Sequence, residues 1–295
     1  MYIDKYGNRW YRGNLHTHTT ISDGARSPEE TKAIYRNMGY DFVALTDHWK
    51  YGDGSEADPS GLLVLSGAEY NYNGSDVLAG VFHIVGFGTE HDPEVTLADG
   101  AQGAVDKIND CGGLAILAHP AWSMNTYDMV MPFRGLFATE IYNSVSGLPR
   151  NCRPYSGIIV DQLAARGYVL PLVADDDTHF HTGEEGMSYI MVNLGDKPLT
   201  RDNLMAALRE NSFIATQAPF FECVREGDEI VVRSETPVSC VTFYTNCPWE
   251  AKRNVTAEDE PIYEARFALH PGVSFVRAEV TDAEGKIGFA QIITV

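Results

Sequence analysis

Histidines and carboxylates recur together at short spacing between residues 14 and 179 of this 295-residue sequence. Imidazole nitrogen and carboxylate oxygen, without thiolate, suit zinc, manganese or iron in hydrolytic sites. One such motif is a weak signal, because a lone histidine is more often a packed or surface residue. Their repetition predicts a metal site. The motifs are Asn14-Leu15-His16-Thr17-His18, Ser22-Asp23-Gly24, Thr46-Asp47-His48, Gly67-Ala68-Glu69, Phe82-His83, Ala118-His119-Pro120 and Asp177-Thr178-His179.

The spacing within the motifs indicates which side chains can share an ion. Residues two apart on a strand point to the same side, so His16 and His18 can bind one ion together. Asp177 and His179 have the same spacing. Asp47 would point to the other side of its strand from His48, so we expect it to orient the loop rather than bind metal.

Short apolar runs alternate with helix-like segments from about residue 13 to 215, a pattern typical of an α/β protein. In a barrel of parallel strands the carboxyl ends form the active face, and the motifs fall at such ends. The predicted helices are 28–37, 101–109, 154–166 and 201–210. The predicted strands are 14–16, 42–46, 62–66, 81–87, 114–118, 138–142, 169–174 and 188–194.

The pattern changes after about residue 216 to alternating polar and apolar residues joined by turn-like Gly and Asp clusters. This pattern predicts a small antiparallel β domain. We therefore expect two domains, an α/β domain that carries the metal-binding motifs over residues 1–217 and a small all-β domain over residues 218–295.

Composition narrows the class of protein. The formal net charge is −19, from 41 acidic and 22 basic residues, which disfavours binding of long nucleic acid. No apolar run is long enough to cross a membrane and the N-terminus lacks a signal-peptide pattern, so we expect a cytoplasmic protein without a membrane partner. The five cysteines lack CxxC spacing, which disfavours a disulfide framework or zinc-thiolate site.

The motifs NLHTHTTISDG, ALTDHW, GAEY, HIVGFG, LAHP and DDDTHF together resemble the PHP family, named for polymerase and histidinol phosphatase members. The resemblance covers residues 13–215. It implies a distorted (β/α)7 barrel, a trinuclear metal centre at the strand ends and hydrolysis of phosphate esters. The antiparallel β segment also resembles the tails of one branch whose members cleave carbamate or carboxyl esters.

The resemblance also implies a ligand set for two or three divalent ions of zinc, manganese or iron. Every ligand place holds a competent donor, unlike the non-catalytic members of the family. Asp23 stands where some histidinol phosphatases have His, which makes histidinol phosphate a less expected substrate. The implied sets are His16, His18, Glu69 and Asp177 for a first ion, Asp23, His48 and His179 for a second, and Glu69, His83 and His119 for a third.

We therefore predict a phosphoesterase that hydrolyses small phosphate esters with a metal-bound hydroxide. Its substrate would be a phosphomonoester or a cyclic phosphodiester of a sugar or nucleotide. A carbamate or carboxyl ester hydrolase is the alternative, and a non-catalytic metal-stabilised module is less favoured. The sequence leaves the oligomeric state open.

Further residues are candidates for roles beside the metal ligands. Asp177 is expected to be catalytic as well as a ligand, and an arginine would clamp the phosphate, Arg150 before Arg153 and Arg134. His181 could donate a proton to the leaving group. Glu140 could orient a ligand, although a structural carboxylate fits its position equally well. Aromatic side chains that could stack on a base or wall off a sugar are Trp49, Tyr70, Tyr72 and Trp122.

Overall fold

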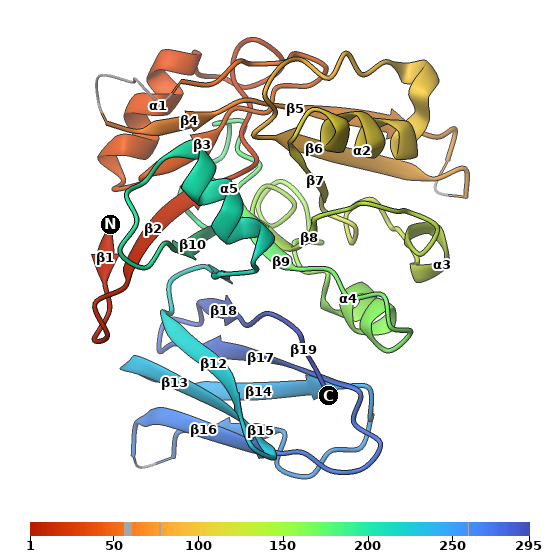
Figure 1. Cartoon of the computed structure of the whole chain (residues 1–295). Helices are drawn as coiled ribbons and strands as arrows, with labels where there is room; N and C mark the ends of the chain where they lie inside the picture. Colours follow the sequence, from red (N-terminus) through yellow and green to blue (C-terminus); the bar gives the residue numbers. More distant parts are fainter. Residues whose placement is uncertain (56–60, 77, 259) are drawn as a thin grey trace.

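A computed structural model describes residues 1–55, 61–76, 78–258 and 260–295. The chain is a mixed α/β protein in which the described helices all end before residue 210, and the C-terminal strands form a layer at the bottom of Figure 1. None of the helices in these residues has the length and hydrophobicity that a membrane-spanning helix requires.

An eleven-stranded sheet runs through the molecule in the order β15-β14-β17-β18-β11-β10-β2-β3-β4, with β1 beside β2 and β19 beside β17. The β2–β3 and β3–β4 pairs are parallel, whereas β10 is antiparallel to β2. The strands of its first part are β1 (Tyr2–Ile3), β2 (Arg9–Asn14), β3 (Phe42–Ala44), β4 (Leu63–Leu65), β10 (Tyr189–Asn193) and β11 (Phe213–Thr216).

A five-stranded sheet faces the first one and has the order β5-β6-β7-β8-β9. Its last three strands are parallel, but β6 is antiparallel to both β5 and β7. The strands are β5 (Gly67–Asn73), β6 (Val81–Phe87), β7 (Leu114–Leu117), β8 (Ala138–Asn143) and β9 (Leu172–Asp175).

The two sheets meet through single bridges rather than continuous ladders. Thr17 pairs with Thr178 at one seam, and His48 pairs with Glu69 at the other. The described residues therefore form no closed hydrogen-bonded barrel. The structure confirms the predicted mixed α/β fold but not the (β/α)7 barrel. A short connection joins β5 to β6, where a parallel pair would need a crossover of a dozen or more residues, and this interrupts the βα alternation.

The predicted helices form, with small shifts at their ends. Ser27 caps the first helix in a capping box with Glu30, as the sequence predicts. The expected helix 154–166 begins later, because residues 154–156 pair with the end of β8 through Asn143 N–H to Pro154 O (2.9 Å). The helices are α1 (Pro28–Asn37), α2 (Gly100–Asp110), α3 (Tyr127–Val130), α4 (Gly157–Ala164) and α5 (Arg201–Arg209), with a 3₁₀ turn at Leu97–Asp99; α3 and that turn were not predicted.

Several strand predictions need correction: β9 begins at Leu172 rather than at residue 169, and β1 and β11 were not predicted. The first strand ends at Asn14 rather than including His16, because the Asn14 side chain accepts the His16 N–H (3.0 Å) and turns the chain toward the site. The strand β5 was not predicted, since the run GAEYNYN mixes apolar and polar residues at the edge of the sheet.

The largest core cluster fills the space between the two sheets and beneath α5. Its members are fully or almost fully buried. Burial of apolar surface contributes about 25 cal/mol per Å², so this cluster is the main apolar support of the strand ends. Examples are Leu15, Phe42, Phe87, Ile116, Leu172, Ile190 and Leu204.

The C-terminal strands pack as a second layered unit with its own core, which includes Ile230, Val241, Phe243, Phe267 and Val280. β18 pairs with β11, so this unit continues the eleven-stranded sheet across the expected division at residues 217/218, which stays a prediction. The strands are β12 (Phe221–Glu226), β13 (Glu229–Val238), β14 (Cys240–Thr245), β15 (Asn254–Thr256), β16 (Ile262–Ala268), β17 (Phe275–Thr281), β18 (Ile287–Phe289) and β19 (Ile293–Thr294).

Candidate metal centre

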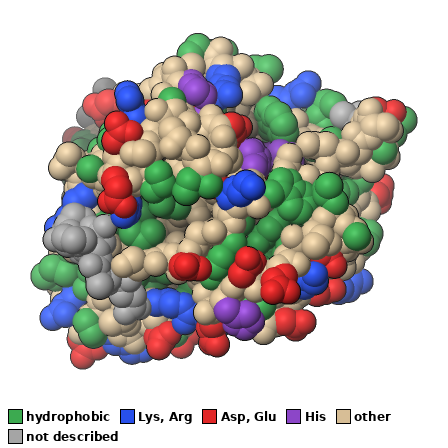
Figure 2. Space-filling model, turned by 90° about the horizontal axis from the view of Figure 1, so that it is seen from above, with side chains coloured by type: hydrophobic (Ala, Val, Ile, Leu, Met, Phe, Trp, Pro, Cys, Tyr) green, Lys and Arg blue, Asp and Glu red, His purple; other side chains and the backbone are tan. Residues whose placement is uncertain are grey.

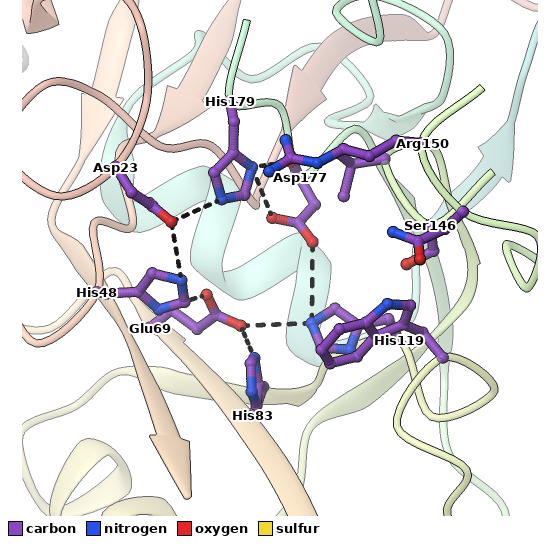
Figure 3. Close-up of a pocket in the computed structure, with 12 residues that line it drawn as sticks. Asp23, His48, Glu69, His83, His119, Ser146, Arg150, Asp177 and His179 are labelled. Atoms are coloured by element: carbon purple, nitrogen blue, oxygen red, sulfur yellow. Dashed lines mark hydrogen bonds and ion pairs between the residues drawn. The ribbon is translucent and has the colours of Figure 1, made fainter. Parts of the chain in front are cut away.

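All nine predicted ligand residues meet in one place, around the strand ends of the two sheets. Figure 3 shows seven of them, all except His16 and His18. Seven of them are buried, whereas His48 is partly exposed and Asp23 is exposed on the solvent side. The loops after β2, β3, β7 and β9 supply His16, His18, Asp23, His48, His119, Asp177 and His179, and the strands β5 and β6 supply Glu69 and His83.

The first donor cluster is formed by two histidines and two carboxylates. His18 Nε2 lies 3.0 Å from Asp177 Oδ1 and 3.2 Å from Glu69 Oε2. His16 Nε2 lies 3.2 Å from Asp177 Oδ1, 3.3 Å from Glu69 Oε2 and 3.2 Å from His18 Nε2. Metal bonds of about 2.0–2.2 Å in a tetrahedral site separate donors by roughly 3.3–3.6 Å, so this cluster fits one ion with little rearrangement.

The other oxygen of Glu69 belongs to the cluster predicted for the third ion, which Glu69 forms with His83 and His119. Glu69 Oε1 lies 2.8 Å from His83 Nδ1 and 3.4 Å from His119 Nε2. His119 Nε2 also lies 3.8 Å from Asp177 Oδ2. Glu69 can therefore bridge two ions, with one oxygen on each.

The remaining cluster is the most open to solvent. Asp23 Oδ2 lies 3.4 Å from His179 Nε2 and 3.8 Å from His48 Nε2. His18 Nδ1 is 3.6 Å from Asp23 Oδ1, but its Nε2 faces the first cluster. Asp23, His48 and His179 are therefore the main donors of this cluster, although His48 Nδ1 also lies 3.0 Å from Glu69 Oε2 of the first cluster.

Two buried donor atoms support cation binding. Asp177 Oδ1 lies 3.0 Å from His18 Nε2, and His48 Nδ1 lies 3.0 Å from Glu69 Oε2, so each of these buried atoms contacts another predicted ligand. Carboxylate oxygens and imidazole nitrogens gathered this closely in a buried place are the donors that a divalent cation binds. The donor set therefore fits divalent ions.

Nearby acceptors orient three of the imidazoles. His179 Nδ1 lies 2.9 Å from Asp177 O, and His119 Nδ1 lies 3.2 Å from Ser123 Oγ. His16 Nδ1 lies 2.7 Å from Glu140 Oε1. Each contact holds the ring with Nε2 toward the clusters, which is the arrangement that metal-binding histidines usually have.

The backbone at two ligands is held in a sparsely populated conformation. Asp177 has φ 51° and His119 has φ 29°, in the left-handed region that non-glycine residues rarely adopt. The Asp177 N–H donates to His16 O (3.0 Å), and the His119 N–H donates to Glu140 Oε2 (2.7 Å). These hydrogen bonds fix the strained loops, as is common at functional sites.

The clusters shift the pKa values of their own members. Burial alone lowers the pKa of His18, but hydrogen bonds and charge from Asp177 and Glu69 raise it to about 9. Burial disfavours ionised Asp177, yet His16 and His18 hold its pKa well below the usual range. Burial lowers the pKa of His48. The carboxylates are therefore ionised, and a divalent cation would take the place of the imidazole protons.

Two acidic residues beside the clusters have positioning roles. Asp47 accepts hydrogen bonds from the Thr19 and Ser22 N–H groups (2.8 and 3.1 Å) and from both hydroxyls, so it shapes the loop before Asp23, as its strand position predicts. Glu140 is fully buried and orients His16, in agreement with the ligand-orienting alternative.

A cavity of about 200 Å³ opens over the clusters. Arg150 lies on its wall, and its guanidinium makes no hydrogen bond or ion pair with a described residue (Figure 3). Ser146, Asn151 and Trp122 line it too, and of these three only Trp122 was a candidate from the sequence. Ser146 and Asn151 could have been found only from their nearness to Arg150 in one loop.

The other predicted residues lie away from the cavity wall. Arg134 donates to Met131 O (2.7 Å) and Phe133 O (2.8 Å), and Arg153 is exposed. His181 is exposed too, with its Nε2 3.2 Å from Asp23 O, so its predicted role as a proton donor gains no support.

The three aromatic candidates away from the cavity pack with one another. The ring centroids of Trp49 and Tyr70 are 5.4 Å apart, as are those of Trp49 and Tyr72. Because none of the three lines the cavity, the structure gives them a packing role.

No protein-family model and no curated protein sequence matches the chain. Among solved structures, the chain is similar to a two-domain protein from Bacteroides vulgatus that contains a predicted PHP-like metal-dependent phosphoesterase. The two share 15% identity over 98% of this chain and 95% of the other, with a TM-score of 0.56. The chain has a PHP-like fold. The match spans both the α/β part and the C-terminal strands, so this PHP-like fold includes the appended β layer.

Two further solved structures show weaker likeness. An amidohydrolase from Chromobacterium violaceum, with bound sulfate and no metal, has 18% identity over 57% of this chain and 87% of the other, with a TM-score of 0.42. A candidate metal-dependent phosphoesterase from Bifidobacterium adolescentis has 15% identity over 68% and 96%, with a TM-score of 0.42. These two likenesses are too weak to add to the argument.

Proposed function

We propose that the protein is a metal-dependent hydrolase of small phosphate esters. The main supporting observation is that three donor clusters, two of which share Glu69, lie beneath a cavity whose wall also presents Arg150, which is unpaired among the described residues. A divalent-ion site beside a guanidinium suits a phosphoryl dianion, since both are positive and the guanidinium fork matches two oxygens.

The ligand sets are those implied by the sequence resemblance. His16, His18, Glu69 and Asp177 would hold one ion, Asp23, His48 and His179 a second, and Glu69, His83 and His119 a third. Such ions supply Lewis-acid charge and lower the pKa of a coordinated water.

The chain's own residues would select and orient the substrate. Arg150 reaches the cavity from the loop after β8 and would hold phosphoryl oxygens. Trp122 packs against His119 (ring centroids 4.9 Å apart) and forms an apolar wall for the leaving group. The small cavity favours a small ester, and monoesters and cyclic diesters remain the two candidates.

The surface supports a small substrate rather than a long polyanion. Lysine and arginine side chains are scattered singly among acidic ones on the face in Figure 2, with no broad basic patch. Together with the net charge of −19, this distribution disfavours nucleic-acid backbone binding.

The test uses protein that has been stripped with a chelator and reloaded with manganese or zinc, and measures phosphate release from monoesters and formation of the monoester product from cyclic phosphates. Nucleoside monophosphates, sugar phosphates and cyclic phosphates form the panel, with carbamate and carboxyl esters beside them. We expect phosphate release that His119→Ala abolishes. Cleavage of carbamate or carboxyl esters without phosphate release would overturn the proposal in favour of that second reaction class.

A further inference from the structure

The loop that carries Arg150 is a folded-back segment with a closed base. At the base, the Ser156 N–H donates to Ile141 O (2.9 Å), and Tyr155 bridges to Tyr142. Nearer the tip, the Arg153 N–H donates to Ser146 O (2.8 Å). These contacts tie the tip of the loop to its base.

The hydrogen bond nearest the tip of the loop lies next to Arg150. The Asn151 N–H donates to Gly147 O (2.7 Å), which closes a tight turn around Arg150. Ser146, Arg150 and Asn151 all face the cavity, so any tilt of the loop would move three wall residues together.

The base of this loop rests on a buried arginine from the C-terminal strands. Arg277 of β17 is 1% exposed, and its Nε and Nη2 donate to Asp161 of α4 at 2.6 and 3.0 Å. Its Nη2 also lies 3.1 Å from the Tyr155 hydroxyl, and its Nη1 donates to Glu279. The Tyr155 hydroxyl itself donates to Glu279.

Phe289 supports the same base from β18. Its ring stacks with those of Tyr142 and Tyr155, with centroids 6.0 and 6.3 Å apart. The C-terminal layer thus contacts both sides of the loop base, through an aromatic ring and through an ionic cluster.

This cluster has the properties of a fixed support. Its charges are paired and hydrogen-bonded. Removing one partner would leave a buried charge unpaired, which is strongly unfavourable. The guanidinium also lies over the Tyr244 ring, 4.0 Å from its centroid, which restricts it further. Arg277 therefore has one well-defined position from which to hold Tyr155.

We propose that Arg277 is a positioning residue: acting through the Tyr155 hydroxyl, it lets the C-terminal β layer set the place of Arg150 in the cavity. The inference rests on the proposed function in its reading of Arg150 as the phosphate-binding group. It gives the β layer a role in substrate binding, although its strands supply no residue that lines the cavity among those described.

Tyr155→Phe is the direct test, because it removes one hydroxyl and keeps the ring on Phe289. Tyr244→Phe is the matched control, since the Tyr244 hydroxyl donates to the same Glu279 (3.2 Å) but lies on β14, outside the loop. For the metal-loaded protein, we expect Tyr155→Phe to raise KM for a phosphate ester about threefold to tenfold with kcat little changed, and to weaken inorganic phosphate binding similarly. Tyr244→Phe should leave both unchanged.

Hydrogen exchange supplies a readout that needs no activity. We expect faster amide exchange at residues 144–153 in Tyr155→Phe than in Tyr244→Phe, at comparable thermal stability. Equal exchange in the two variants, or equal KM values, would overturn the positioning role. If the wild-type protein hydrolysed neither phosphomonoesters nor cyclic phosphodiesters, the proposed function would fail, and the exchange comparison would still decide whether Arg277 and Tyr155 position the loop.

Discussion

Glu140 Oε1 lies 2.7 Å from His16 Nδ1, and both side chains are fully buried. An ionised carboxylate only accepts hydrogen bonds, so Nδ1 carries the proton and Nε2 is left for a metal ion. The other oxygen of Glu140 accepts from the His119 N–H (2.7 Å) and from Asn143 Nδ2 (2.7 Å), which also lies 3.2 Å from Asp177 Oδ2. One carboxylate therefore supports ligands of two clusters.

Replacement of this carboxylate should weaken metal binding without removing a ligand. We expect Glu140→Gln to lower the metal affinity about 10–100-fold, as for other partners of metal-binding histidines. Competition with a fluorescent chelator measures the affinity, and Glu29→Gln on the exposed face of α1 is the control. Unchanged affinity in Glu140→Gln would mean that His16 needs no such partner.

The shared position of Glu69 predicts an unequal loss of metal. Its two oxygens face different clusters, whereas His83 belongs to one. We expect Glu69→Gln to reduce the bound metal, measured by elemental analysis after gel filtration, more than His83→Ala does. Equal losses in the two variants would contradict a bridging role for Glu69.

Arg150 and Arg153 lie in the same loop and offer a matched pair. Only Arg150 lines the cavity, so Arg150→Ala should lower kcat/KM for a phosphate ester about 10–100-fold, the value of a hydrogen bond to a charged group. Arg153→Ala should change it less than about threefold. Similar losses in both variants would point to a general charge effect rather than a clamp.

The motif residues and the helices were predictable because their signals are local. His16 and His18, for example, fall at the turn that ends a strand, and Ser27 with Glu30 marks a helix start within four residues. The open seams between the sheets were not predictable, since they depend on pairing between segments far apart in the sequence, such as Thr17 with Thr178. The contact of Tyr155 with Arg277 lies beyond sequence patterns for the same reason: 122 residues separate them.

Asp4 should make stability depend on pH at the acidic end. Burial raises its pKa, but hydrogen bonds from Trp10, Asn8 and Tyr6 outweigh this and lower it to about 2. A carboxyl with a lowered pKa stabilises the fold above its usual pKa, and this contribution is lost as pH falls from about 4 to about 2.

Asp4→Asn removes the charge and turns an amide toward these donors. We expect it to lower the free energy of unfolding by about 1–2 kcal/mol near neutral pH, because Trp10 and Asn8 lose a charged acceptor. Urea unfolding across the acidic range should show the difference shrinking below about pH 4. A difference that stayed constant with pH would assign the effect to shape rather than to charge.

Metal loading should stabilise the whole fold, because the clusters connect both sheets. His16 follows a strand of the eleven-stranded sheet, whereas Glu69 lies in the five-stranded sheet. An ion held between them would replace repulsion among the buried carboxylates Glu69 and Asp177 with attraction. At free metal near 100 times Kd, mass action contributes about 2.7 kcal/mol, or roughly 5 °C or more in Tm. Thermal unfolding with and without a chelator measures the shift. His119→Ala should keep part of it, since its loss leaves the first cluster intact, and a full loss in this variant would mean that the clusters bind metal only as a unit.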